Sequence, residues 1–134
     1  MSDTKPPLCT IWVDGHPKGP NGGGTLRSRI RDKMYYRDTV AWLCREYWSS
    51  IPAPLGRGRV VCTLVRVGGL PKDQDNAYSS LKGAIDGLTT KHGGSLLIDD
   101  APDHLDLDVR QEKGPKRGVR IEIWDASDEQ EGAA

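Results

Sequence analysis

Four stretches of the chain have the hydrophobic pattern of β-strands. Residues 8–13 and 59–67 are runs of apolar and β-branched side chains, and the second run is typical of a strand in the middle of a sheet covered on both faces. Residues 104–110 and 119–123 alternate between apolar and charged side chains, as strands with one exposed face do. A short basic turn with Pro and Gly separates the last two stretches, so the sequence predicts an antiparallel hairpin if this turn closes.

Two further stretches have the periodicity of amphipathic helices. Apolar residues recur every three or four positions over residues 33–48 and again over residues 76–88, which places them along one face of a helix. The proline-containing segment 49–54 ends the first helix, and Asp75 or Asn76 is a suitable N-cap for the second. The elements together predict an α/β fold of the α+β type, a small mixed β-sheet with two main helices packed on it.

The length of the chain suits one domain. With 134 residues, 36% of them hydrophobic, it can bury one modest core, which dimerisation would extend. We expect residues 1–7 to be a disordered lead-in, residues 8–124 to form the domain and residues 125–134 to be a flexible acidic tail. No apolar run approaches the roughly 18 residues of a membrane span, and the first residues lack the pattern of a signal peptide. We therefore expect a cytoplasmic protein without a membrane partner.

Basic and acidic residues are equal in number, 19 of each, but they are segregated along the chain. Residues 16–37 are mainly basic, whereas residues 99–108 contain five aspartates and no Lys or Arg. The equal totals argue against binding to nucleic acid through bulk charge alone, but the segregation permits a basic surface around an acidic pocket. The side chains that we expect to contact DNA phosphates are Arg27, Arg29, Arg31, Lys72, Lys113, Lys116 and Arg117.

The glycine-rich segment 14–24 is expected to be a mobile loop. It lacks the glycine and lysine spacing of a nucleotide-binding loop, so we expect no nucleotide cofactor. A flexible basic flap over a nucleic-acid backbone and a plain surface linker both remain open interpretations of this segment.

The three cysteines, Cys9, Cys44 and Cys62, lie far apart within apolar stretches. Their odd number and wide spacing predict buried free thiols rather than a disulfide framework or a zinc site. The histidines are scattered through loop-like segments and receive no predicted role.

Two acidic sites stand at the ends of predicted elements. Asp73 and Asp75 follow the strand over residues 59–67, and Asp100 follows the second predicted helix. If the fold brings these three carboxylates together, they would form the oxygen-rich site that Mg²⁺ prefers. A cation held there could neutralise the charge that develops when a phosphodiester is cleaved. The alternative is that the three acids only cap helices and solvate turns.

The order of these motifs resembles the RusA family of Holliday junction resolvases. The resemblance covers residues 8–124, and its motifs are Tyr-Arg-Asp-Thr-Val at 36–40, Asp-x-Asp-Asn at 73–76, Lys-Gly-Ala-Ile-Asp-Gly-Leu at 82–88, Leu-Ile-Asp-Asp at 97–100 and Arg-Ile-Glu-Ile at 120–123. It implies a RusA-like homodimer that binds four-way DNA junctions in recombination and repair. Such a protein nicks two strands symmetrically with Mg²⁺, for which Mn²⁺ can substitute.

The resemblance also implies roles for individual residues. Asp73, Asp75 and Asp100 would bind the metal and act in catalysis, and Lys82 would be the counterpart of the family's catalytic lysine. The family usually has this lysine at the position of Ser79, so about one helical turn is inserted before Lys82 if it takes that role. The shifted lysine leaves a second hypothesis open, a DNA-binding or interaction protein that keeps the fold with weak or no cleavage.

Overall fold

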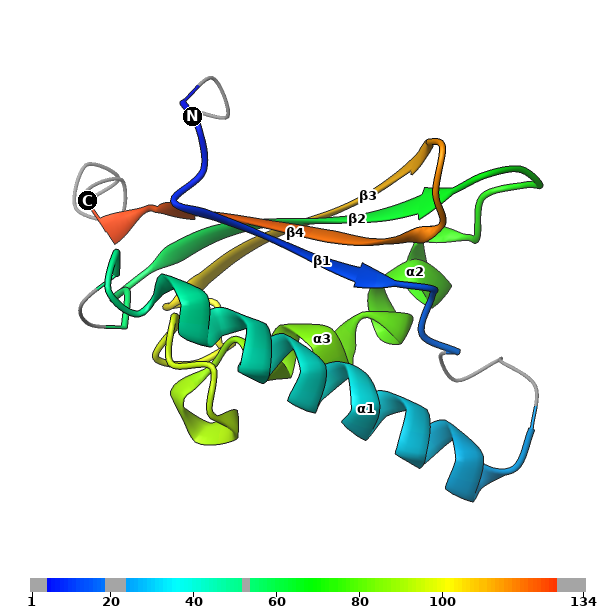
Figure 1. Ribbon diagram of the computed structural model, residues 1–134, viewed down its shortest axis with the longest axis horizontal. Helices are drawn as coiled ribbons and strands as arrows, with labels where there is room; N and C mark the ends of the chain where they lie inside the picture. Colours follow the sequence, from blue (N-terminus) through cyan, green and yellow to red (C-terminus); the bar gives the residue numbers. More distant parts are fainter. Residues whose placement is uncertain (1–4, 19–23, 52–53, 128–134) are drawn as a thin grey trace.

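The strands form one four-stranded sheet, and the helices lie on one side of it (Figure 1). The structure is a computed structural model that describes residues 5–18, 24–51 and 54–127. The strands are β1 (Cys9–Asp14), β2 (Gly58–Arg66), β3 (Leu105–Lys113) and β4 (Gly118–Asp125), in the order β1-β4-β2-β3. β4 is antiparallel to β1 and β2, and β3 is parallel to β2. The predicted α+β architecture, a mixed sheet with helices packed on it, is therefore confirmed.

The predicted hairpin of the last two strands is wrong, because β2 lies between β3 and β4. The turn after β3 crosses the end of β2, where the Gly114 amide donates to the Arg66 carbonyl (2.9 Å). β2 is buried over almost its whole length, whereas β3 carries the charged side chains that suit a sheet edge. The most apolar strand thus takes an interior position and separates the two strands that the turn connects.

The first helix begins earlier than predicted. α1 spans Leu26–Cys44 and continues into a 3-10 turn, η1 (Arg45–Tyr47). Thr25 is its N-cap and accepts a hydrogen bond from the Ser28 amide (3.1 Å). The buried residues of α1 begin only at Tyr36, which explains why the hydrophobic pattern indicated a later start. The exposed first turns form because a good cap and helical propensity suffice where no side chain has to be buried.

The basic residues at the start of α1 lie on a helix. Arg27, Arg29 and Arg31 all lie within its first turns. Before the helix, the Lys18 amide donates to the Asp32 carboxylate (2.8 Å), so this flank of the predicted mobile loop is held in place. Residues 19–23 of that loop, 1–4 of the predicted lead-in and 128–134 of the predicted tail lie outside the described residues.

The second predicted helix is broken into two. α2 (Gln74–Ser80) and α3 (Lys82–Gly87) meet at Leu81, whose φ and ψ are −88° and −3°. The Leu81 amide donates to the Tyr78 carbonyl (3.2 Å), three residues back, a contact typical of a tightened helical turn. Leu81 itself is fully buried. The loop that follows contains a short 3-10 turn, η2 (Thr90–His92).

α3 approaches α1 closely through two buried glycines. A Cβ added at Gly83 would lie 2.6 Å from the carbonyl oxygen of Lys33, and one added at Gly87 would overlap the carbonyl oxygen of Arg37. Real Cβ atoms essentially never come so close. The distance between the two helices is therefore set by the absence of side chains at these two positions.

The two faces of the sheet are covered differently. Alternate residues of each strand face the helices and form the core, among them Ile11, Val60, Leu64, Ile121 and Ile123. On the opposite face of β2, Val61, Thr63 and Val65 are only 1–3% exposed, although no second layer of secondary structure covers them in the described chain. Charged residues of β3 and β4 are their neighbours in register. β2 is thus buried on both faces, as predicted. On the face turned away from the helices it is covered by the long charged side chains of β3 and β4.

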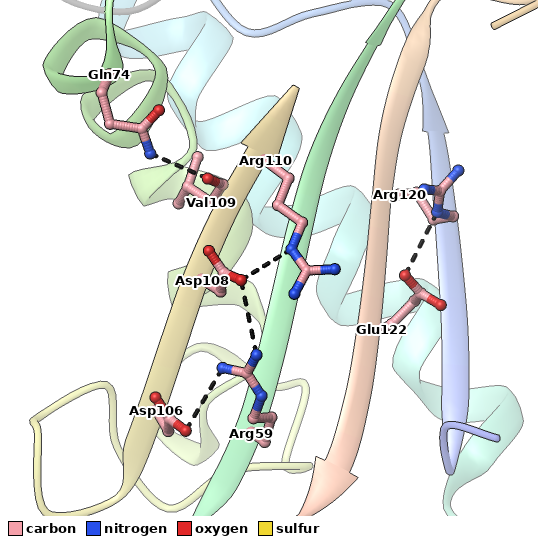
Figure 2. Close-up of polar contacts among 8 residues, drawn as sticks. All are labelled: Arg59, Gln74, Asp106, Asp108, Val109, Arg110, Arg120 and Glu122. Atoms are coloured by element: carbon pink, nitrogen blue, oxygen red, sulfur yellow. Dashed lines mark hydrogen bonds and ion pairs between the residues drawn. The ribbon is translucent and has the colours of Figure 1, made fainter. Parts of the chain in front are cut away.

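Ion pairs connect the charged side chains of this open face, which is turned away from the helices (Figure 2). Arg59 lies between Asp106 (3.5 Å) and Asp108 (3.6 Å), and Arg110 pairs with Asp108 (2.8 Å). Further along, Arg120 pairs with Glu112 and Glu122. The sequence predicted which side chains of β3 face outward, but the ion pairs that they form also depend on the register between β2 and β3.

Residues on either side of the predicted domain form hydrogen bonds with it. Trp124 Nε1 donates to the Lys5 carbonyl (2.8 Å), and the Ala126 amide donates to the Arg57 carbonyl (3.0 Å). Ala126 is buried. Lys5 and Ala126 therefore contact the folded unit, while the predicted domain of residues 8–124 stays a prediction.

All three cysteines are free and buried, as predicted. Burial raises the pKa of Cys9, Cys44 and Cys62 to about 12, so these thiols stay protonated and unreactive at neutral pH. Separately, none of the helices formed by the described residues has the length and apolar character needed to cross a membrane.

Candidate functional site

Asp73 and Asp75 stand at the N-terminus of α2, shortly after the end of β2. Asp73 is the N-cap, and its Oδ1 accepts a hydrogen bond from the Asn76 amide (2.9 Å) while Oδ2 accepts one from Asn76 Nδ2 (2.9 Å). Asp75 lies in the first turn and is exposed. Capping therefore accounts for the position of Asp73 in the motif, but it does not account for Asp75, whose carboxylate faces solvent.

The start of α2 is fixed to the edge strand β3 by two glutamines. The Lys72 amide donates to Gln111 Oε1, and Gln111 Nε2 donates back to the Lys72 carbonyl, both at 2.8 Å. Gln74 Nε2 donates to the Val109 carbonyl (3.0 Å; Figure 2). These bonds hold the backbone of the acidic motif against the second half of β3.

Asp100 lies elsewhere, in the connection that leads into the beginning of β3. Its carboxylate is beside Asp86 of α3 and beside Asp99. Partial burial raises the pKa of Asp100, and the hydrogen bonds with Asp99 and Asp86 together with the charge of Asp86 raise it further. The nearby Lys82 ammonium acts in the opposite direction. The backbone amide of Asp100 donates to Asp99 Oδ1 (2.7 Å) and thereby lowers the pKa of Asp99.

The structure does not bring Asp73, Asp75 and Asp100 together. Over the described residues, no three His, Cys, Asp or Glu side chains form a group that could hold a metal ion. Gln74 of the motif contacts β3 at Val109, whereas Asp100 lies before the start of β3 and beside Asp86 and Lys82 of α3. The carboxylates present therefore do not fit the expected three-aspartate magnesium site, and their catalytic roles stay a prediction.

Lys82 is grouped with the second acidic site rather than with the first. It is exposed at the start of α3, and its charge acts on Asp100. The break at Leu81 separates it from the helix that carries Asp75. Lys82 also lines an open groove of about 450 Å³ between α1 and α2, together with Arg29 and Ser79.

The expected DNA-binding residues fall into two regions. Arg27, Arg29 and Arg31 lie on α1, while the others gather near the ends of β2 and β3, namely Lys72, Lys113, Lys116 and Arg117. Lys116 forms an ion pair with Asp14 (2.9 Å), which is exposed and therefore contributes little stability. Hydrogen bonds from Lys116 and Trp12 lower the pKa of Asp14.

Lys72 and Arg117 share a cavity of about 320 Å³ with two basic side chains that the sequence had not singled out, His16 and Arg66. His16 Nε2 lies 2.7 Å from the Val65 carbonyl oxygen, 49 positions away in the sequence. Burial lowers the pKa of His16, and the charges of Arg117 and Lys72 lower it further, against the effect of the Val65 hydrogen bond. Nothing local in the sequence could have paired these residues, because the sheet brings them together.

Replacing Asp100 by asparagine is expected to stabilise the fold at pH 7. The folded-state pKa of Asp100 is raised, so its contribution to stability is fully present below the unfolded-state pKa and is lost as the pH rises through the folded-state pKa. The amide removes the repulsion from Asp86, and because the site is largely solvent-accessible we expect a gain below about 1 kcal/mol. Urea unfolding of both proteins at pH 7 and at pH 3 would measure it. An equal gain at both pH values would contradict the assignment to charge.

Comparison with protein-family models and with curated proteins finds no match to this chain.

Proposed function

We propose that the protein is a magnesium-dependent, structure-specific endonuclease that resolves four-way DNA junctions by paired symmetric nicks, as its resemblance to the RusA family implies. The observation that carries the proposal is that the segment after β2 holds both basic and acidic residues within four positions, Lys72, Asp73 and Asp75. The cap Asp73 directly follows Lys72, and the exposed Asp75 lies two residues further on. Lys72 lines the basic cavity together with Arg66 and Arg117. Cleavage of an anionic backbone requires both carboxylates and cations, and this short segment carries both.

The basic residues have a defined task in this proposal. A phosphodiester is anionic, so guanidinium and ammonium groups bind it and fix the strand. Asp75 then lies three residues from Lys72 in the sequence, on a helix start that Gln74 and Gln111 hold in position. A helix N-terminus also favours negative charge in its vicinity. Binding by shape and backbone charge suits a four-way junction, whose identity is its geometry rather than its base sequence.

A homodimer is part of the proposal, because paired nicks on opposite strands need two copies of the site. α1 has large apolar side chains on its outer surface at intervals of four residues, Leu26, Ile30, Met34 and, after Asp38, Trp42. Trp42 is 66% exposed, so it does not serve the core of one chain. These side chains supply a surface that a second copy could cover.

The second candidate is a DNA-binding protein with this fold but without efficient cleavage. It is favoured by one observation, the grouping of Asp100 and Lys82 with Asp86 at a distance from Asp73 and Asp75. A protein of this kind would still use the basic cavity to hold DNA. It would have no need for an assembled set of carboxylates.

Incubation of the purified protein with a synthetic four-way junction and Mg²⁺ separates the two candidates. The nuclease should make paired symmetric nicks, prefer the junction to linear duplex, and lose cleavage on removal of the metal with a chelator. Binding without nicks, under conditions where the protein is folded and dimeric, would support the second candidate instead. Cleavage of duplex and junction at equal rates would contradict the assignment to junctions.

A further inference from the structure

The basic cavity at the end of β2 is assembled from four separate segments of the chain. His16 follows β1, Arg66 ends β2, Lys72 precedes α2 and Arg117 precedes β4. In Figure 1 the turn between β3 and β4 and the connection from β2 to α2 lie at the same end of the sheet. Tertiary structure, rather than a basic run in the sequence, therefore concentrates the positive charge here.

Hydrogen bonds fix the backbone around the three cations of the cavity, Arg66, Lys72 and Arg117. The Gly15 amide donates to the Arg117 carbonyl (3.1 Å), and the Gly114 amide donates to the Arg66 carbonyl (2.9 Å). Lys72 is held on both sides of its Cα by Gln111. The side chains thus start from fixed points, which reduces the ordering cost when a ligand binds.

The charge of the cavity is not balanced from within. Its lining contains no carboxylate, and within the described residues Arg66, Lys72 and Arg117 make no ion pair with one. Burial lowers the pKa of Lys72, the charge of Arg117 lowers it further, and Asp32 only partly opposes them. Cations held together at such a cost are stabilised by an anion placed between them.

Besides the cations, the cavity is lined by the apolar side chains of Leu64, Val67 and Leu70. Leu70 is 93% exposed, so a large apolar side chain stands at the mouth of a charged pocket without packing on the core. The cavity volume of about 320 Å³ lies at the small end of the range for small-molecule sites and exceeds what a bare phosphate needs. The ligand should therefore carry both an anionic group and a flat or apolar part.

We propose that this cavity binds one nucleotide, with its phosphate between Arg66, Lys72 and Arg117 and its sugar or base against Val67 and Leu70. The same chemistry is offered by the phosphorylated end of a nucleic-acid strand and by a free nucleotide. The proposal goes beyond cleavage and does not depend on it, since a protein that cuts no DNA would still have this pocket. It rests on the proposed function only in favouring a strand as the source.

The test is titration of the ¹⁵N-labelled full chain with deoxyadenosine 5′-monophosphate, without metal or junction, followed by amide NMR shifts. We expect saturable shifts around the cavity, competition by inorganic phosphate, and no binding of deoxyadenosine, which lacks the anion. Arg117→Gln should weaken binding about 10- to 100-fold, since a hydrogen bond to a charged group contributes about 1.5–3 kcal/mol. A 5′-phosphorylated oligonucleotide that binds more tightly than the mononucleotide would identify a strand as the source, and the reverse order would identify a free nucleotide.

Matched variants at Leu70 distinguish a loss of nucleotide binding from a loss of folding. Leu70→Glu places a carboxylate beside the cations at an exposed position and should weaken binding as strongly as Arg117→Gln, while Leu70→Gln should change it less than about threefold. Lys91→Gln, in the exposed part of η2, removes a charge elsewhere and should leave binding unchanged. The proposal fails if the wild type shows no saturable binding, or if Arg117→Gln and Leu70→Glu bind as well as Lys91→Gln. Nucleotide binding without junction cleavage would uphold the pocket and reject the nuclease.

Discussion

Replacement of Gly87 by alanine is expected to lower the free energy of unfolding by about 3 kcal/mol or more, the upper end of the usual cost of overpacking. The added methyl group would overlap the carbonyl oxygen of Arg37 and come within 3.0 Å of Val40 Cβ in α1. Alanine favours the helical state over glycine by only about 1 kcal/mol, so the steric overlap outweighs this gain and the substitution destabilises the fold. Thermal unfolding followed by circular dichroism should show a melting temperature about 10 °C lower.

Gly68→Ala is the matched control for this experiment. Gly68 is exposed in the connection after β2, its φ is not in the left-handed region, and a Cβ there would meet nothing within 4 Å. Its melting temperature should stay within about 2 °C of the wild type. If Gly87→Ala proved as stable as Gly68→Ala, then α1 and α3 would not be in the close contact described above.

Conversion of Asp73 to asparagine is expected to abolish junction cleavage, a loss of about 100-fold or more, while leaving the fold intact. Asparagine is as good an N-cap as aspartate, so its side-chain oxygen can still accept the Asn76 amide, and stability should change by less than about 1 kcal/mol. Cleavage should fall because the negative charge beside Lys72 is lost, and contributions of charged groups in active sites amount to several kcal/mol. Nicking rates on the four-way junction and urea unfolding should be measured on the same preparation.

The comparison with Asp75→Asn makes this result specific. Asp75 has no capping role, so its substitution should leave stability unchanged and remove cleavage to the same extent. Asp103→Asn, at an exposed residue of the acidic stretch 99–108, should keep full activity. If Asp73→Asn and Asp75→Asn both nick junctions at the wild-type rate, the acidic motif is a helix cap and an exposed turn, and the nuclease proposal falls.

Local sequence features predicted the elements that depend on local patterns. The apolar run of β2 and the alternation of β3 indicated both strands and which residues of β3 face outward. The start of α1 was missed because the prediction followed only the apolar stripe that begins at Tyr36 and is buried, although the exposed Leu26, Ile30 and Met34 also have helical spacing. The break at Leu81 was missed because Ala77, Leu81 and Ala84 keep helical spacing through it.

The tertiary arrangement could not be predicted by the same means. The turn after β3 indicated a hairpin of β3 and β4. Strand pairing also depends on which strand is the most apolar, and the apolar β2 lies between these two strands. The convergence of Asp73, Asp75 and Asp100 was inferred from their places at the ends of elements. Because β2 and β3 are parallel, the end of β2 and the start of β3 lie at opposite ends of the sheet.

The open face of the sheet has a consequence for how a polyanion can approach the protein. Its three arginines, Arg59, Arg110 and Arg120, are matched by four acids, Asp106, Asp108, Glu112 and Glu122, and the ion pairs leave no positive excess. A nucleic acid that drifts toward this broad flank meets slight repulsion rather than attraction, whereas the rim formed by the loops beyond β2 and β3 is cationic. If the protein binds nucleic acid as proposed, a strand would therefore approach the basic loops beyond β2 and β3 rather than the open face of the sheet.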